Sequence, residues 1–250
     1  NKSNLRNNII NIIDKFSDDI LFIDLFGGSF YLSYLIKSIK PKANIICNDY
    51  DYYINRLLNI DKTNKLFSLI KECFSPNYRP YTKMSVADAE KIKNLISKYN
   101  DYIDWLTIGT KLTYSGSFIN SAEKFNKAIL YYNNLSPINN DISEYIKDIS
   151  IVHYDWKKLY FKYNNVKNVV FLVDPPYLNS NTSTYDGEQI DHKFLYDNLF
   201  LNDNKFILFS LSDNKLLDEY INDQYNLISV KRKTLNSTSS KSIKYELIIY

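Results

Sequence analysis

The amino-acid sequence predicts an α/β fold, built on a parallel sheet that a mostly helical segment interrupts. Three observations lead to this prediction, and the first two concern the sheet. Apolar runs over 21–26 and 43–47 flank a helical pattern, and a third run over 169–173 is followed by two prolines. A strand, a helix and a second strand in this order are the unit of a parallel sheet. The third observation is a change in character between residues 62 and 150, where helical patterns dominate.

The first fifty residues or so predict a helix, a strand, a helix and a second strand. Apolar residues on one helix face predict the helices, and unbroken apolar runs predict the strands. The first strand ends in the turn Gly27-Gly28-Ser29, and the second strand ends at Asn48-Asp49. The four elements span residues 5–16, 21–26, 30–39 and 43–47.

Residues 62–150 are predicted to form an insertion, so that the core consists of residues 1–61 and 151–250. Helical spacing covers 89–99 and 122–133, and a polar, aromatic loop lies between these two stretches. Because little in this part has the pattern of a sheet strand, we expect the insertion to be mostly helical.

The last hundred residues or so return to strand patterns. The run Val169 to Val173 is uniformly apolar, which is typical of a central parallel strand covered on both faces. Pro175 and Pro176 prevent that strand from continuing. The predicted strands are 149–153, 169–173, 206–210 and 245–250, with a helix from about 191 to 201.

The composition excludes several classes of protein. With 45% apolar residues, 5 Gly and 6 Pro among 250 residues, the chain is neither collagenous nor a linker. No apolar run approaches the roughly 18 residues that a membrane-spanning helix needs, so we expect no membrane partner. Cys47 and Cys73 form no metal-binding spacing, so we expect no metal and a reducing, cytoplasmic setting.

The net charge and the residue bias are weaker indications. A net charge of +3 permits an anionic partner without requiring one. The chain is rich in Asn, Lys, Ile and Tyr, which is typical of an AT-rich genome, so we expect a bacterial, phage or viral origin. The chain begins without a methionine, and we expect further residues upstream of Asn1.

Three acidic residues each close a predicted strand, namely Asp24, Asp49 and Asp174. In open α/β sheets the ligand lies outside the carboxyl ends of the strands, so we expect these residues around one cleft. The Gly27-Gly28 turn allows the backbone to approach a ligand closely. Two plainer alternatives stay open, because such a turn is often only a turn and such an acid is often a helix cap. The pattern GxGxxG is absent, so a dinucleotide site is not indicated.

The tetrapeptide Asp174-Pro175-Pro176-Tyr177 is the most specific signal in the chain. A rigid turn explains its prolines but not the flanking Asp and Tyr. An amino group on a planar base is a poor nucleophile, because its lone pair is delocalised into the ring. The Asp174 carboxylate and the Pro175 carbonyl can each accept a hydrogen bond from one N–H of such an amino group. These hydrogen bonds direct the nitrogen lone pair at an electrophile. The prolines make that carbonyl rigid, and Tyr177 offers a face on which the base stacks.

On these residues the sequence resembles the Dam-type DNA adenine methyltransferases, the alpha-ordered group with the motif DPPY. Further segments resemble this family's motifs, in the family's order. They are Asp24 to Ser29 (the cofactor loop), Asn48-Asp49, Tyr154-Asp155-Trp156, Phe209 to Asp213, and Lys231-Arg232 with Lys244 to Ile249 (the closing segment). Gly27 and Phe30 depart from the pattern, because many relatives have Ala, Cys or Val at the first position and Gly or a small residue at the second.

The resemblance implies a Rossmann-like, S-adenosylmethionine-dependent methyltransferase core with a mostly helical target-recognition insertion. The implied reaction is methyl transfer to the exocyclic amino nitrogen of adenine in duplex DNA, after the base is flipped out of the stack. The implied catalytic residues are Asp174, Pro175, Pro176 and Tyr177. The implied cofactor-binding residues are Lys2, Asp24, Phe26, Gly28, Asp49, Asp155 and Asp174, and no metal is implied.

Double-stranded DNA with a short adenine-bearing target is the implied partner, and a cognate restriction endonuclease is a further candidate. Positive side chains are expected to face the phosphates, and the insertion is expected to enter a groove. For the positive residues near the C-terminus, a solvated basic face is the alternative. The expected DNA-binding residues are Lys111, Tyr114, Lys231, Arg232 and Lys233.

Two alternatives to the whole interpretation stay open. The acceptor can be RNA instead of DNA, which substrates of matched sequence would separate. The chain can also be a catalytically silent DNA-binding module of the same fold, although the intact Asp174 and Tyr177 argue against it.

Overall fold

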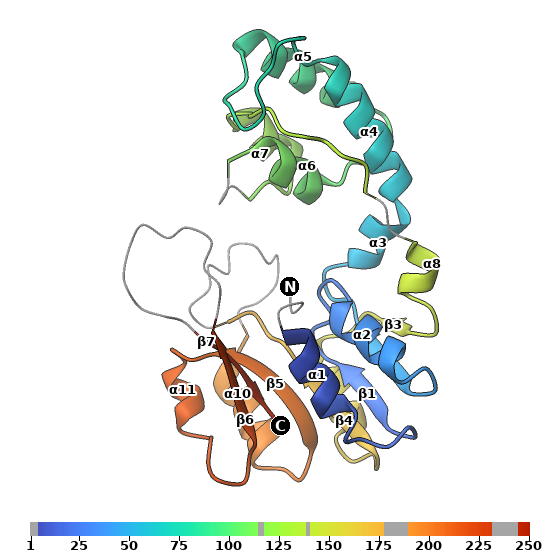
Figure 1. The fold of residues 1–250 in the computed structure, drawn as a ribbon, viewed down its shortest axis with the longest axis vertical. Coiled ribbons are helices and arrows are strands. Elements are labelled where there is room, and N and C mark those ends of the chain that lie inside the picture. The colour runs from blue at the N-terminus through green and yellow to red at the C-terminus, as the bar shows by residue number, and fades with distance from the viewer. Residues whose placement is uncertain (1–4, 115–117, 139–140, 178–189, 232–244) are drawn as a thin grey trace. The chain divides into compact units, whose positions relative to one another are not determined.

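A computed structural model describes residues 5–114, 118–138, 141–177, 190–231 and 245–250 (Figure 1). The chain divides into two compact units, one of Asn1–Tyr53 with Ser143–Tyr250 and one of Ile54–Ile142. Each end of the inserted unit therefore lies eight residues before the predicted one (54 against 62, and 142 against 150). The predicted start falls inside helix α4 (Ile60–Glu72), whose apolar residues belong to the insertion's own core.

The larger unit contains a seven-stranded sheet in the order β3-β2-β1-β4-β5-β7-β6 (Figure 1). Neighbouring strands from β3 to β5 are parallel, whereas β7 is antiparallel to both of its neighbours. This mostly parallel sheet confirms the predicted Rossmann-like α/β core. The strands are β1 (Leu21–Asp24), β2 (Asn44–Asn48), β3 (Ser150–Val152), β4 (Val169–Val173), β5 (Lys205–Leu211), β6 (Leu227–Lys231) and β7 (Tyr245–Ile249).

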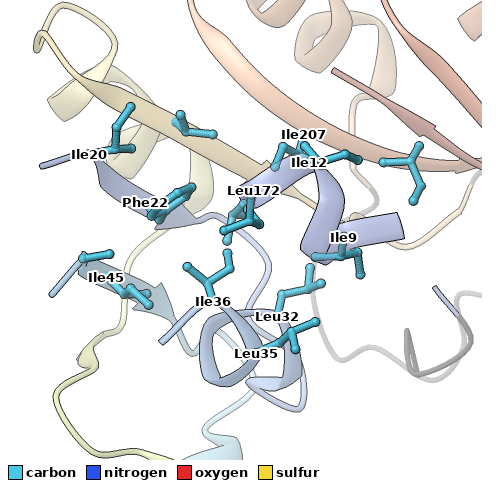
Figure 2. Close-up of a cluster of buried hydrophobic side chains, with 14 of the residues drawn as sticks. Ile9, Ile12, Ile20, Phe22, Leu32, Leu35, Ile36, Ile45, Leu172 and Ile207 are labelled. Carbon is cyan, nitrogen blue, oxygen red and sulfur yellow. The ribbon is translucent and has the colours of Figure 1, made fainter. Parts of the chain in front are cut away.

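Helices cover both faces of the sheet. Successive strand residues point to opposite faces, and apolar side chains stand on both of them. Phe22 of β1 packs in one apolar cluster with helices α1 (Arg6–Ile13) and α2 (Tyr31–Ile39), as Figure 2 shows for part of that cluster. The next residue, Ile23, belongs to the cluster on the other face. That face carries α9 (Trp156–Tyr163), α10 (His192–Phe200) and α11 (Lys215–Asp218).

Strand β4 confirms the prediction of a central strand. All five of its residues are buried, and it pairs in parallel with β1 on one side and β5 on the other. An unbroken apolar run is what a strand covered by helices on both faces requires.

The inserted unit is mostly helical, as predicted, and has an apolar core of its own. Among the described residues, helices α4, α5 (Val86–Ser97), α6 (Trp105–Leu112) and α7 (Ala122–Lys127) lie within it. Helices α3 (Tyr53–Leu58) and α8 (Ile142–Tyr145) span its two boundaries. None of the described helices is long and apolar enough to cross a membrane.

The predicted helix over 122–133 is wrong in its second half. Helix α7 ends at Lys127, and the chain then turns to an extended conformation at Ala128. The Met84 N–H donates to the Leu130 carbonyl (2.9 Å), and the Tyr132 N–H donates to the Thr82 carbonyl (2.9 Å). The backbone groups of this segment therefore form hydrogen bonds with residues 82 and 84 instead of with each other along a helix.

Candidate active site

The carboxyl ends of β1 and β4 form the topological switch point of the sheet. From β1 the chain continues to β2 on one side, whereas from β4 it continues to β5 on the other. Open α/β sheets bind their ligands in the crevice at such a point. Asp24 is the last residue of β1 and pairs in register with Leu172, and Asp174 directly follows β4. Asp49 follows β2, the other neighbour of β1, so the three predicted acids lie at adjacent strand ends.

Asp24 is fully buried, and its carboxyl has a raised pKa. The pKa of its carboxyl is raised from 3.8 to about 7. Burial is the largest cause, the hydrogen bond from Ser33 lowers the pKa, and the negative charge of Asp174 raises it. The Ser33 hydroxyl donates to Asp24 Oδ2 at 3.0 Å, and the Phe26 N–H donates to Oδ1 at 3.3 Å. Asp24 and Asp174 are thus close enough for their charges to interact, which a shared site requires.

Replacing Asp24 with asparagine is expected to flatten the dependence of stability on pH. Because the folded-state pKa of about 7 lies above 3.8, Asp24 contributes most to stability below pH 4 and loses this contribution as the pH rises to 7. The wild-type free energy of unfolding should fall relative to Asp24→Asn by up to about 1.4 kcal/mol per pH unit in that window. Urea unfolding at pH 4, 5, 6 and 7 measures both slopes, and the exposed Asp203→Asn is the control. Parallel slopes for wild type and Asp24→Asn would contradict the raised pKa of the Asp24 carboxyl.

The glycine turn after β1 packs directly against the end of β2. The Gly27 N–H donates to the Asn48 carbonyl at 3.0 Å. A Cβ at Gly27 would lie 2.5 Å from Cys47 Sγ and 2.8 Å from that carbonyl, so no larger residue fits without a shift. This contact explains why glycine stands where the resembling family often has Ala, Cys or Val. Gly28, which is exposed, adopts a left-handed φ of 50°, a conformation that favours glycine.

Phe30 ends the turn in a conformation that also favours glycine. Its φ is 60°, yet its side chain is fully buried and packs edge-on against Tyr53, with ring centroids 5.5 Å apart. The Tyr145 hydroxyl donates to the Ser29 carbonyl at 2.7 Å, which holds the turn from another side. Packing therefore outweighs the backbone strain of a left-handed aromatic residue.

Asp49 is buried, and both a backbone N–H and a side chain contact it. Its Oδ1 accepts the Tyr53 N–H at 2.6 Å, and its carbonyl lies 2.6 Å from His153 Nδ1. The His153 ring lies 3.8 Å, centroid to centroid, from that of Tyr52. The exposed side chain of Tyr50 follows Asp49 directly, so an aromatic surface adjoins this acid.

Asn48 connects the ends of three segments at the site. Its amide donates to the Leu25 carbonyl (3.1 Å) and to the Tyr154 carbonyl (3.0 Å), and its oxygen accepts the Tyr154 N–H (2.9 Å). Asp155 follows Tyr154 and is the N-cap of α9, accepting the N–H groups of Lys157 and Lys158. Asp155 is exposed. The helix-cap alternative concerned Asp24, Asp49 and Asp174, and of these Asp49 accepts the N–H of Tyr53, the first residue of α3. The predicted residue Phe26 lies beside α9, with its ring 5.7 Å from that of Trp156.

The tetrapeptide after β4 is partly exposed at three of its four positions, Asp174, Pro176 and Tyr177. Asp174 and Tyr177 are half-buried, whereas Pro175 is buried. The Tyr177 hydroxyl donates to Glu246 Oε1 at 2.9 Å and lies 3.4 Å from Asp174 Oδ1. The acid and the phenol of this motif thus lie within hydrogen-bond range of each other at the switch point.

His192 lies near the motif at the start of α10. Burial lowers the pKa of its imidazole, and the nearby Pro176 carbonyl raises it. Its Nδ1 is buried and has no hydrogen-bond partner in the part of the chain that the structure describes. The prediction from sequence assigned no role to His192 or Ser33, and it included Asn48 and Glu246 only within segments that resemble the family's motifs.

For several predicted residues the structure gives no position at the switch point. Lys2, Arg232 and Lys233 fall outside the described residues, and Lys231 is described only as the last position of β6. Lys111 and Tyr114 lie at the end of α6 and just beyond it, in the inserted unit. Tyr114 is 69% exposed, whereas Lys111 is half-buried. Among the described residues, no group of three or more His, Cys, Asp or Glu side chains is arranged to hold a metal ion.

Comparison with known proteins gives one informative relative. The chain is 32% identical over 174 residues to a protein of Haemophilus influenzae described as a "putative methyltransferase". The match covers 69% of this chain but only 58% of that protein. No protein-family model matches the chain. Precorrin-6y C5,15-methyltransferase from Geobacter metallireducens GS-15 aligns over 99% of this chain and 87% of its own, but with a TM-score of 0.38 and 8% identity.

Proposed function

We propose that this protein is an S-adenosylmethionine-dependent methyltransferase that methylates the exocyclic amino nitrogen of adenine at a short site in duplex DNA. One observation carries the proposal: Asp174 and Tyr177, both half-buried, lie at the switch point of the sheet, where the charge of Asp174 reaches Asp24. The description of the Haemophilus influenzae relative supports the class of reaction. The strand order with an antiparallel β7 fits the methyltransferase core that the motifs imply.

The residues at the switch point suit S-adenosylmethionine. The carboxylates of Asp24 and Asp49 are acceptors for its ammonium and its ribose hydroxyls. Among the described residues, a Cβ at Gly28 would meet the Phe26 carbonyl alone, at 3.8 Å, so the described chain leaves room for a ligand near this backbone. The exposed rings of Tyr50 and Tyr154 offer apolar surface for its adenine. When bound, this cofactor supplies an electrophilic methyl group on a sulfonium sulfur.

The tetrapeptide prepares the acceptor nitrogen. In the proposed reaction the Asp174 carboxylate and the Pro175 carbonyl each accept a hydrogen bond from one N–H of the adenine amino group. These two hydrogen bonds draw the nitrogen toward tetrahedral geometry and direct its lone pair outward. The Asp174 charge stabilises the positive charge that develops on the nitrogen. The alkylated nitrogen is acidic, so its proton leaves without a separate strong base.

Recognition of duplex DNA requires base flipping, because the amino group of adenine is otherwise inside the stack. Extruding a base costs a few kcal/mol, and stacking on an aromatic side chain offsets part of that cost. Tyr177 is the aromatic residue of the motif, and the exposed Tyr114 belongs to the inserted unit proposed to recognise the target.

Labelled methyl transfer to genomic DNA tests the proposal, because a genome offers every short target sequence at once. The full chain is incubated with S-adenosylmethionine carrying a tritiated methyl group and with genomic DNA that lacks N6-methyladenine. Parallel reactions contain total RNA or the same DNA after heat denaturation. The nucleic acids are digested to nucleosides and separated by chromatography. We expect the label in N6-methyldeoxyadenosine, with duplex DNA as the best substrate.

Other outcomes distinguish the alternatives. Label that appears only in adenosine of RNA would favour an RNA methyltransferase. Binding of DNA without any transfer, together with no binding of S-adenosylmethionine by calorimetry, would favour a catalytically silent module. Label in cytosine would contradict the proposed acceptor.

A further inference from the structure

A side chain far from the motif in sequence holds the aromatic residue of the motif. The Tyr177 hydroxyl donates to Glu246 Oε1 at 2.9 Å, across 69 positions of the chain. Its distance to Asp174 Oδ1 is longer, at 3.4 Å. A distance of 2.9 Å is typical of a good hydrogen bond, whereas 3.4 Å is near the limit. Of these two oxygens, Glu246 Oε1 is therefore the better acceptor for this phenol.

We propose that Glu246 is a positioning residue that orients Tyr177 and so keeps the Asp174 carboxylate available to the acceptor amino group. This inference rests on the proposed function for its catalytic consequence. The orientation of Tyr177 itself follows from the hydrogen bond and does not depend on the reaction.

Glu246 lies on one of the more firmly held strands of the sheet. Strand β7 pairs with β5 on one side and with β6 on the other, so that Glu246 lies opposite both Leu211 and Val230. A residue between two neighbouring strands has a fixed register, because a slip would turn the strand's apolar side chains out of the core. Leu247, Ile248 and Ile249, which follow Glu246, are all buried in that core. The carboxylate is thus presented from a rigid element.

The phenol can serve only one acceptor well, because its hydroxyl carries a single proton. While that proton is directed to Glu246, Asp174 Oδ1 is not the phenol's principal acceptor. Without the Glu246 carboxylate, the nearest of these acceptors is Asp174 Oδ1, 3.4 Å away. The Tyr177 hydroxyl would then turn toward Asp174 and compete with the amino group for hydrogen bonding to that carboxylate. Glu246 thus acts on the reaction through Tyr177 and touches no reacting atom.

Four variants test this role. Glu246→Ala and Tyr177→Phe each remove the hydrogen bond, whereas Glu246→Gln keeps an amide oxygen as acceptor. The fourth is the double variant Glu246→Ala/Tyr177→Phe, and the exposed Glu219→Ala is the matched control. We expect Glu246→Ala to lower kcat on the order of 10-fold or more, with the KM for S-adenosylmethionine changed less than about twofold. Glu246→Gln should recover most of kcat.

The double variant separates positioning from general damage to the fold. If Glu246 acts through the phenol, adding Glu246→Ala to Tyr177→Phe should lower kcat no further. Losses that multiply in the double variant would overturn the inference, as would a Glu246→Ala variant with wild-type kcat.

A structural readout keeps the inference separate from the proposed function. Crystal structures of wild type and Glu246→Ala should show the Tyr177 hydroxyl moved from position 246 toward Asp174. An unmoved ring would overturn the inference even if the wild type transfers methyl groups. A moved ring in a protein that transfers no methyl group would support the positioning role and contradict the proposed function.

Discussion

Replacing Asp174 with alanine is expected to lower kcat for methyl transfer by about two to three orders of magnitude, the loss typical of removing one preorganised electrostatic partner. Alanine removes both the acceptor for one amino N–H bond and the charge that stabilises the alkylated nitrogen. Asp174→Asn keeps a carbonyl acceptor but no charge, so its kcat should lie between those of wild type and Asp174→Ala. Initial rates with tritiated S-adenosylmethionine and saturating DNA measure all three.

Asp203→Ala is the matched control for this series. Asp203 is an exposed acid just before β5, at the amino end of that strand, whereas Asp174 lies beyond the carboxyl end of β4. The control should retain wild-type kcat, and circular dichroism should show that all variants are folded. Equal rates for wild type and Asp174→Ala would remove Asp174 from the mechanism.

Replacing Phe30 with alanine is expected to cause the largest loss of stability, about 3–5 kcal/mol, the range for deleting a fully buried aromatic ring. The ring is fully buried after the glycine turn, on a backbone with φ of 60°. Because glycine adopts that conformation without strain, Phe30→Gly should be more stable than Phe30→Ala by about 1 kcal/mol. Urea unfolding followed by circular dichroism compares the free energies.

The half-exposed Phe161 of α9 provides the control for this pair. It is 50% exposed, so Phe161→Ala should lose much less stability than Phe30→Ala. If Phe30→Gly is less stable than Phe30→Ala, the left-handed conformation at this position is wrong. If Phe30→Ala resembles Phe161→Ala, the ring does not support the turn.

The prediction from sequence was most successful where a short segment decides its own structure. The uniformly apolar residues 169–173 form β4 with the predicted bounds, and the helix predicted from about 191 to 201 is α10, His192–Phe200. Both patterns involve only neighbouring residues. Apolar residues of both elements pack in the same buried cluster. The adjacent placement of Asp24, Asp49 and Asp174 followed from the same reasoning, because parallel strands end at one edge of the sheet.

The prediction was incomplete where distant segments decide the outcome. Strand β6 (Leu227–Lys231) was not predicted, since it forms only by pairing with β7. Residues 128–133 were predicted to be helical. Backbone hydrogen bonds to residues 82 and 84, which are distant in the sequence, hold part of this segment extended. Backbone groups satisfy their hydrogen bonds wherever partners lie, so propensity alone does not decide such segments.

The sequence by itself determined the α/β class, the central strand and the positions at which acidic and aromatic residues leave the sheet. These features depend on the periodicity of apolar residues and on turns, which act over a few neighbouring positions. Only the tertiary structure decided that burial and Asp174 raise the pKa of Asp24, that Gly27 must be small, and that Tyr177 donates to Glu246. Desolvation, steric fit and hydrogen bonding depend on side chains that folding brings together from distant parts of the chain, and no local pattern records which ones meet.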